Sequence, residues 1–148
     1  MSGVVVLDTG PLGLLTNPNN TPQPRACRAW LATLRAAGRR VIVPDIADYE
    51  VRRELIRIQS HSALANLDAF GVQLDYLPLT TDAMRRAAEL WAQARHSGQP
   101  MAPDPALDGD VILVAQALTL NTAVVVATGN PGHLTRFVAA ELWSNIIP

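Results

Sequence analysis

Short apolar runs alternate along this chain with longer stretches in which apolar residues recur every three or four positions. The runs are rich in β-branched residues, as in strands buried on both faces of a sheet, and they cover residues 4–7, 40–44, 74–79, 124–127 and 142–147. The helical stretches cover residues 25–37, 46–60, 62–70, 82–96 and 108–118. Strands separated by helices indicate βαβ units and therefore an α/β fold with a mainly parallel sheet.

Small polar residues at the element boundaries predict helix caps. Thr9 is expected to cap a helix that opens with Gly10 and Pro11, because proline fits the first helical turn. Other expected helix starts lie at Asp45 with Asp48, at Thr80 or Thr81, and at Asp108 with Asp104 as an alternative. Gly71 is expected to end the helix that begins near residue 62.

Length and composition predict one soluble domain over residues 1–148. The chain is 49% hydrophobic, enough for a proper core, and no apolar run approaches the ~20 residues of a spanning helix. The first residues lead directly into a strand rather than a signal peptide, so we expect a cytoplasmic protein without membrane association. Cys27 is the only cysteine, which excludes an intramolecular disulfide and a cysteine zinc site.

The type of charge is more informative than its sum. The formal net charge is −1, so no overall positive field marks a nucleic-acid-binding protein. All 12 basic residues are arginine. The absence of lysine excludes Schiff-base chemistry and the phosphate-binding lysine of many nucleoside triphosphatases.

Three acidic residues are predicted to meet at one edge of the sheet. Asp8 ends the first apolar run, Glu50 follows the second strand by about one helical turn, and Asp110 precedes apolar residues at helical spacing. Turn formation by Asp8 and helix capping by Asp110 are the structural alternatives. Carboxylates brought this close repel one another unless a cation lies between them, which favours a divalent ion with oxygen ligands.

Four segments in order then resemble one known family. VVLDTGPL, IADYEVRREL, DGDVILVAQAL and VVATGNPGHL are similar to the motifs of the PIN-domain family, and of VapC-like toxin ribonucleases in particular. The resemblance implies a three-layer α/β/α fold with a parallel sheet of four or five strands. It further implies an Mg²⁺- or Mn²⁺-dependent endoribonuclease that cleaves RNA, pairs with a small antitoxin protein and forms a homodimer.

The family's functional residues map onto this chain with one departure. By resemblance, Asp8, Glu50 and Asp110 are metal ligands, and Thr128 and Asn130 are a catalytic polar pair that orients the water or a carboxylate. Where the family commonly has a further acid, this chain has His133. Either that ligand is missing, or His133 or Asp108 takes its place.

Arg52 and Arg53 share the helix of Glu50 and are candidate phosphate contacts. Their alternative role is surface pairing with Glu50 and Glu54.

Other functions compete with the ribonuclease interpretation. Asp8-Thr9-Gly10 spells the signature of aspartic proteases, but those are all-β proteins, whereas this chain has strong helical periodicity. Phosphotransfer domains with an aspartate after the first strand use a lysine that is absent here. The remaining alternative is a catalytically weak or inactive PIN-like module that binds RNA or regulates, and His133 is the feature that favours it.

Overall fold

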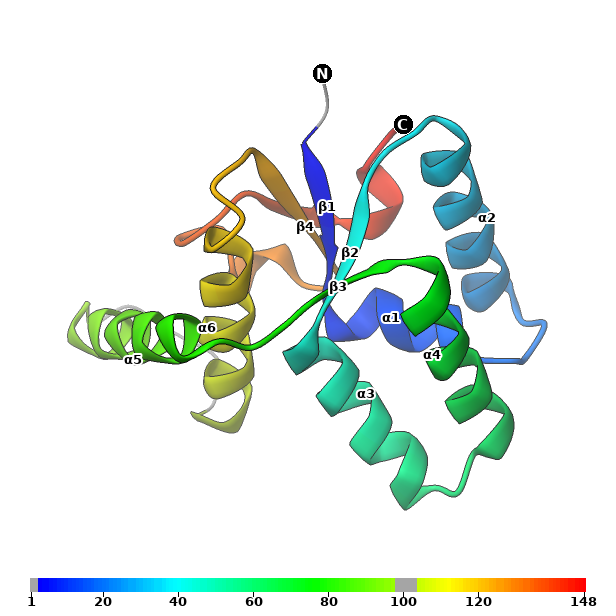
Figure 1. Ribbon diagram of the computed structural model, residues 1–148, viewed down its shortest axis with the longest axis horizontal. Coiled ribbons are helices and arrows are strands. Elements are labelled where there is room, and N and C mark those ends of the chain that lie inside the picture. Colours follow the sequence, from blue (N-terminus) through cyan, green and yellow to red (C-terminus); the bar gives the residue numbers. More distant parts are fainter. Residues whose placement is uncertain (1–2, 98–103) are drawn as a thin grey trace.

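The computed structural model describes residues 3–97 and 104–148 and shows a five-stranded sheet between helices (Figure 1). The strand order is β3-β2-β1-β4-β5, and all neighbouring strands are parallel. The strands are β1 (Val4–Leu7), β2 (Val41–Pro44), β3 (Asp75–Leu77), β4 (Val124–Thr128) and β5 (Ala140–Leu142). The predicted parallel sheet is confirmed. The last strand lies earlier than predicted, because residues 143–145 turn into a short 3₁₀ helix, η2 (Trp143–Asn145).

Helices cover both faces of this sheet. In Figure 1, α5 and α6 lie on one side, and α1, α2 and α4 lie on the other. The helices are α1 (Thr9–Thr16), α2 (Pro22–Ala36), α3 (Asp45–Arg57), α4 (His61–Gln73), α5 (Thr81–His96) and α6 (Asp104–Leu118), followed by the 3₁₀ helix η1 (Pro131–His133). The three-layer α/β/α arrangement is therefore confirmed.

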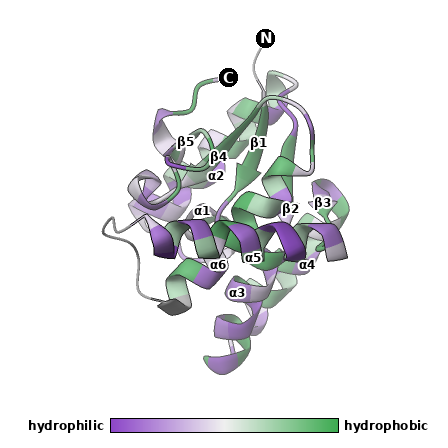
Figure 2. Ribbon diagram, turned by 90° about the vertical axis from the view of Figure 1, so that its left-hand side faces the viewer, coloured by the Kyte–Doolittle hydropathy of each residue, from purple (hydrophilic) through white to green (hydrophobic). Residues whose placement is uncertain are grey.

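The apolar runs form the centre of the core. Val5, Val6 and Leu7 of β1 are completely buried, as the absence of polar alternation in this run predicts. Figure 2 shows hydrophobic strands between helices whose outer faces carry much hydrophilic character. Each fully buried aliphatic side chain contributes roughly 1.5–3 kcal/mol of transfer free energy. Among the residues that the structure describes, no helix is long and apolar enough to cross a membrane.

The starts of helices α1 and α6 differ from the first predicted caps, and an acidic residue is involved in both. Helix α1 begins at Thr9, and its N-cap is Asp8, whose Oδ1 accepts a hydrogen bond of 2.7 Å from the Thr9 amide. Helix α6 begins at Asp104, the alternative start, so Asp108 and Asp110 both lie inside the helix and neither is its cap. Pro105 favours the earlier start, because proline is tolerated in the first helical turn. At α5 the prediction is confirmed: the Thr80 hydroxyl accepts from the Ala83 amide.

Helix α3 starts at Asp45 as predicted, but its own side chains do not cap it. Its N-cap is Pro44, which forms no side-chain cap, and the Asp45 carboxylate accepts from the Leu79 amide instead. The Ile46 amide donates to Oε1 of Gln116, a fully buried residue of α6, whose Nε2 donates to the Leu77 carbonyl. A side chain of α6 therefore fixes the start of the helix that carries Glu50.

Helix α4 continues past the predicted stop at Gly71 and ends at Gln73. Glycine lowers helix stability without forbidding the helical conformation. The side of α4 at Gly71 is open: an added Cβ would meet only the Tyr76 ring, at 4.0 Å.

Candidate active site

The carboxyl ends of β1 and β4 place the first acidic residue. Leu7 pairs with Ala127, and the Asp8 amide donates to the Ala127 carbonyl at 2.9 Å, so Asp8 and Thr128 leave the sheet side by side. The Thr128 hydroxyl, buried at the end of β4, donates to Asp8 Oδ2 at 2.7 Å. Because the Thr9 amide holds the other oxygen, the Asp8 carboxylate has a defined orientation.

Glu50 reaches the same region from α3, which follows β2. The Thr9 hydroxyl donates to Glu50 Oε1 at 2.8 Å, and this bond connects two segments that are 41 residues apart. Among the described residues, the cation that contacts Glu50 is the half-exposed Arg53 guanidinium, whose Nη2 lies 3.8 Å from Glu50 Oε2. Such an exposed pair at the limit of contact neutralises the carboxylate only weakly.

Asp110 is the least satisfied carboxylate of the three. Its Oδ2 is buried and has no hydrogen-bond partner. Burial, with the negative charges of Asp8 and Glu50 as further causes, raises the pKa of Asp110 to about 7. A buried polar atom without a partner is costly in a folded protein, so its presence indicates a functional demand such as the binding of a cation.

The three predicted acids therefore interact electrostatically, because the charges of Asp8 and Glu50 contribute to the raised pKa of Asp110. Each acid comes from a different helix or helix cap. Within residues 3–97 and 104–148, no three histidine, cysteine, aspartate or glutamate side chains lie close enough together to hold a metal ion without moving. One oxygen of Asp8 and one of Glu50 accept hydrogen bonds from threonine hydroxyls. An ion would have to draw the carboxylates together.

Asn130 and His133 lie beside this cluster. The backbone amide of Asn130 donates to the Thr128 hydroxyl oxygen at 3.1 Å, and the side-chain nitrogen of Asn130 lies 3.3 Å from Nε2 of His133. The other ring nitrogen of His133, Nδ1, lies 3.7 Å from Asp110 Oδ2. His133 thus lies beside Asp110 Oδ2, the buried oxygen without a hydrogen-bond partner.

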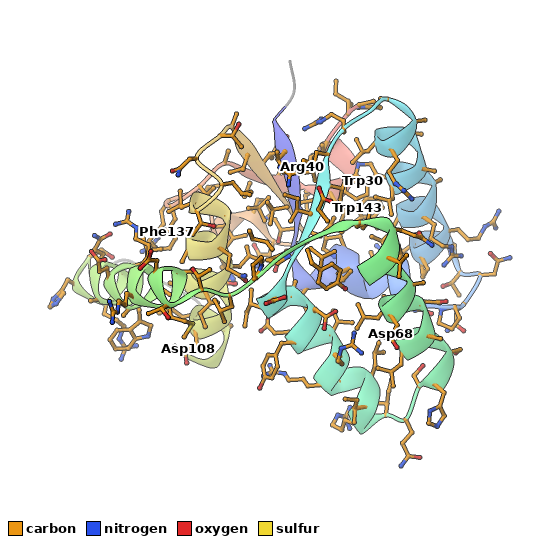
Figure 3. The ribbon with its side chains drawn as sticks, viewed as in Figure 1. Trp30, Arg40, Asp68, Asp108, Phe137 and Trp143 are labelled. Atoms are coloured by element: carbon orange, nitrogen blue, oxygen red, sulfur yellow. The ribbon has the colours of Figure 1, made fainter. Side chains whose placement is uncertain are left out.

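Asp108 is placed differently. It lies near the start of α6, on the side of α5 (Figure 3), at an apolar hollow of about 400 Å³. The other residues around this hollow are Met84, Ala87, Ala88, Trp91, Val111 and Ile112.

Arg52 and Arg53 have different surroundings on α3. Arg52 forms ion pairs of 2.8 Å with Asp48 and with Asp68 of α4, so its partners are other acids than the predicted Glu50 and Glu54. Figure 3 shows Asp68 on the α3–α4 side of the molecule. Arg53 lies over the ring of Tyr49 and contacts Glu50. Arg53 is therefore the one of the two that stands beside the candidate site.

Thr9 is the residue that the sequence interpretation assigned to another role. It was expected to cap α1, but its hydroxyl orients Glu50. The available signal is its position directly after Asp8, because a hydroxyl next to a site carboxylate is well placed to reach a second one.

Comparisons with known proteins fit this geometry. The family model of the PIN domain matches residues 5–145. The chain belongs to the PIN domain family. No curated protein sequence matches the chain at a significant level.

Solved structures share the PIN fold over almost the whole chain. VapBC2 from Rickettsia felis, bound to a DNA fragment from its promoter, is 16% identical with a TM-score of 0.72, covering 93% of this chain and 97% of its own. FitAcB from Neisseria gonorrhoeae is 18% identical with a TM-score of 0.68, covering 97% and 100%. DNA-bound VapBC from Salmonella typhimurium is 22% identical with a TM-score of 0.64, covering 95% and 98%. At these identities the likeness concerns the fold.

Proposed function

We propose that this PIN domain is a metal-dependent endoribonuclease. PIN domains are generally nucleases, and the chain matches the family over nearly all its length. The observation that carries the proposal is the unpartnered Asp110 Oδ2, buried beside Asp8 and Glu50 without a close, buried cation. Such a cluster has a physical reason if it holds a divalent ion.

The donor atoms suit Mg²⁺ or Mn²⁺. Asp8, Glu50 and Asp110 would supply hard carboxylate oxygens, and when bound the ion lowers the pKa of a water and polarises the scissile phosphate. Thr128 holds Asp8 in orientation, and Asn130 is tied to Thr128, so the pair keeps that ligand in place. His133 is the candidate fourth ligand, since its ring nitrogen already lies near Asp110. Asp108, also a predicted ligand, lies at the α5–α6 hollow and is the weaker candidate.

Arg53 is the proposed substrate contact. Its guanidinium stands between the exposed surface of α3 and Glu50, where it could meet a phosphate oxygen of an RNA strand. Arg52 is the weaker candidate because Asp48 and Asp68 already engage its guanidinium.

The proposed biological role is that of the toxin in a toxin–antitoxin pair. VapBC and FitAcB assemblies share this fold, and nearly the full length of their matched chains is covered. The proposed partners are RNA as substrate, a small antitoxin protein and a second copy of this chain. The fold alone is common to these proteins, so the role is tested through RNA cleavage and its inhibition by a co-expressed antitoxin.

The deciding experiment is cleavage of structured and single-stranded RNA by purified protein with Mg²⁺, with Mn²⁺ and with a chelator. Cleavage should require the ion and disappear in Asp110→Asn. Asp68→Asn is the matched control, because Asp68 is an acid in an exposed ion pair on α4. Cleavage that persists in Asp110→Asn or in the chelator would show a contaminating nuclease or a different site.

A catalytically weak, RNA-binding or regulatory module is the second candidate. The observation that favours it is His133, which lies beside Asp110 and stands where the family resemblance implies an acid. Binding of RNA without any metal-stimulated cleavage by the pure protein would support this candidate over the nuclease.

A further inference from the structure

Gly109 lies against the carboxylate of Glu50. It is buried in α6 directly before Asp110, and a Cβ built on it would lie 2.6 Å from Glu50 Oε2. The same Cβ would lie 3.1 Å from Cδ and 3.2 Å from Oε1. No side chain other than hydrogen fits at position 109 while Glu50 keeps its present place.

Glycine is an unfavourable residue inside a helix, so its presence in α6 calls for a local reason. Two other helical glycines provide the comparison. At Gly13 of α1 an added Cβ would meet nothing within 4 Å, and at Gly71 of α4 it would meet only an ordinary contact. Of these three glycines, Gly109 is the one whose missing side chain makes room for a site carboxylate.

We propose that Gly109 is a positioning residue for Glu50. The carboxylate lies between the Thr9 hydroxyl, which donates to Oε1, and the bare Cα of Gly109 beside Oε2. Glu50 can thereby approach the backbone of α6 at the point from which Asp110 projects. This inference deepens the proposed function and rests on it, since it concerns how one proposed ligand reaches the ion.

A methyl group at position 109 would act on Glu50 before it acts on the fold. The clashing atoms belong to the far end of a flexible side chain, so the carboxylate can rotate away while α3 and α6 keep their places. That rotation would remove Glu50 from Asp8 and Asp110. Metal affinity is expected to fall because one of three carboxylate ligands no longer converges on the ion.

The first test is calorimetric titration of Mn²⁺ into the wild type, Gly109→Ala, Gly13→Ala and Gly71→Ala. Gly109→Ala should weaken Mn²⁺ binding by about 10–100-fold, the range found when groups that orient metal ligands are altered. The two control substitutions add the same methyl group to a helix and should leave the affinity unchanged. Equal affinity for Gly109→Ala and the wild type would overturn the inference.

The second test needs no metal. Thermal unfolding is compared for Gly109→Ala in the wild type and in the Glu50→Ala background. Without Glu50 the clash is gone, so the added methyl should raise the midpoint through helix propensity, while in the wild type that gain should be absent. An equal change in both backgrounds would overturn the inference.

These tests separate the two proposals. A wild-type chain that binds no Mn²⁺ overturns the proposed function. The inference about Gly109 is then decided by the thermal comparison alone.

Discussion

Helix α3 carries acidic residues into two clusters with opposite surroundings. On one side, Asp48 accepts hydrogen bonds from Arg52 at 2.8 Å and from the Tyr76 hydroxyl at 2.7 Å, and Arg52 continues to Asp68. On the other side, Glu50 joins Asp8 and Asp110, where the described residues nearby are the Arg53 guanidinium, 3.8 Å from Glu50, and the His133 ring, 3.7 Å from Asp110. The two clusters are separated by only two positions of the same helix.

This difference is the one expected between a structural acid and a proposed metal ligand. In the Asp48 cluster every recorded charge has an opposite partner, and the pKa of Arg52 is raised by its hydrogen bond to Asp48. In the Asp110 cluster the pKa of a carboxyl is raised by burial and by like charges. A folded protein tolerates the second arrangement when a ligand relieves it, and the proposed ligand is a divalent ion.

The largest expected effect comes from Asp110→Asn. Cleavage should fall by more than about 100-fold, since loss of a ligand should exceed the loss seen for groups that merely orient one. Stability without metal should stay equal or rise, because one of three mutually repelling charges is removed. Cleavage assays and thermal melts measure both quantities.

Asp8→Asn should behave in the same way, because asparagine caps a helix as well as aspartate does. A large drop in the unfolding midpoint of either variant would identify that residue as a structural group instead.

Asp48→Asn should produce the opposite pattern. Removing this charge leaves Arg52 and Tyr76 with a poorer acceptor and should lower the free energy of unfolding by about 1–3 kcal/mol. RNA cleavage per folded molecule should persist. Asp68→Asn removes only the exposed ion pair with Arg52 and should cost less than ~1 kcal/mol. Chemical denaturation of both variants compares the two losses of unfolding free energy. Equal losses in the two variants would contradict the difference in burial on which this contrast depends.

The pH dependence of stability should carry the sign of the Asp110 shift. Its folded pKa of about 7 lies above the ordinary value of 3.8, so the folded state binds the proton more tightly than the unfolded state. The stabilisation from this group is fully present below pH 3.8 and is lost as pH rises toward and through 7. Without metal, the unfolding free energy of the wild type minus that of Asp110→Asn should decrease from pH 4 to pH 8. Denaturant titrations of both proteins at a series of pH values measure this difference. A flat difference would show that Asp110 ionises normally.

The smallest effect is expected from His133→Asp. If His133 is a ligand, imidazole favours Mn²⁺ over Mg²⁺, and a carboxylate should narrow that preference by a factor of roughly 3–10. Titration of both ions into both proteins measures it. Identical affinities would remove His133 from the site.

Most of the layer architecture follows from local pattern. The apolar runs at 4–7, 40–44 and 124–127 predict buried parallel strands, and β1, β2 and β4 form there. The amphipathic period of α5 and the Thr80 cap were also predictable, because both depend on residues within a few positions of one another. The least accurate bounds belong to β5, which has only three residues, and to the start of α6.

By itself the sequence determined that Asp8 lies where the first strand ends and that Glu50 lies in the helix after the second strand, because an abrupt change from apolar to polar residues marks each strand end. Only the tertiary structure decided what those acids contact. Thr9 bonds to Glu50 across 41 residues, Gln116 caps a helix 70 residues away, and Arg52 reaches Asp68 instead of Glu54. Contacts of this kind depend on how α3 and α6 pack against the sheet. No local pattern in the sequence encodes how closely Glu50 of α3 approaches Gly109 of α6.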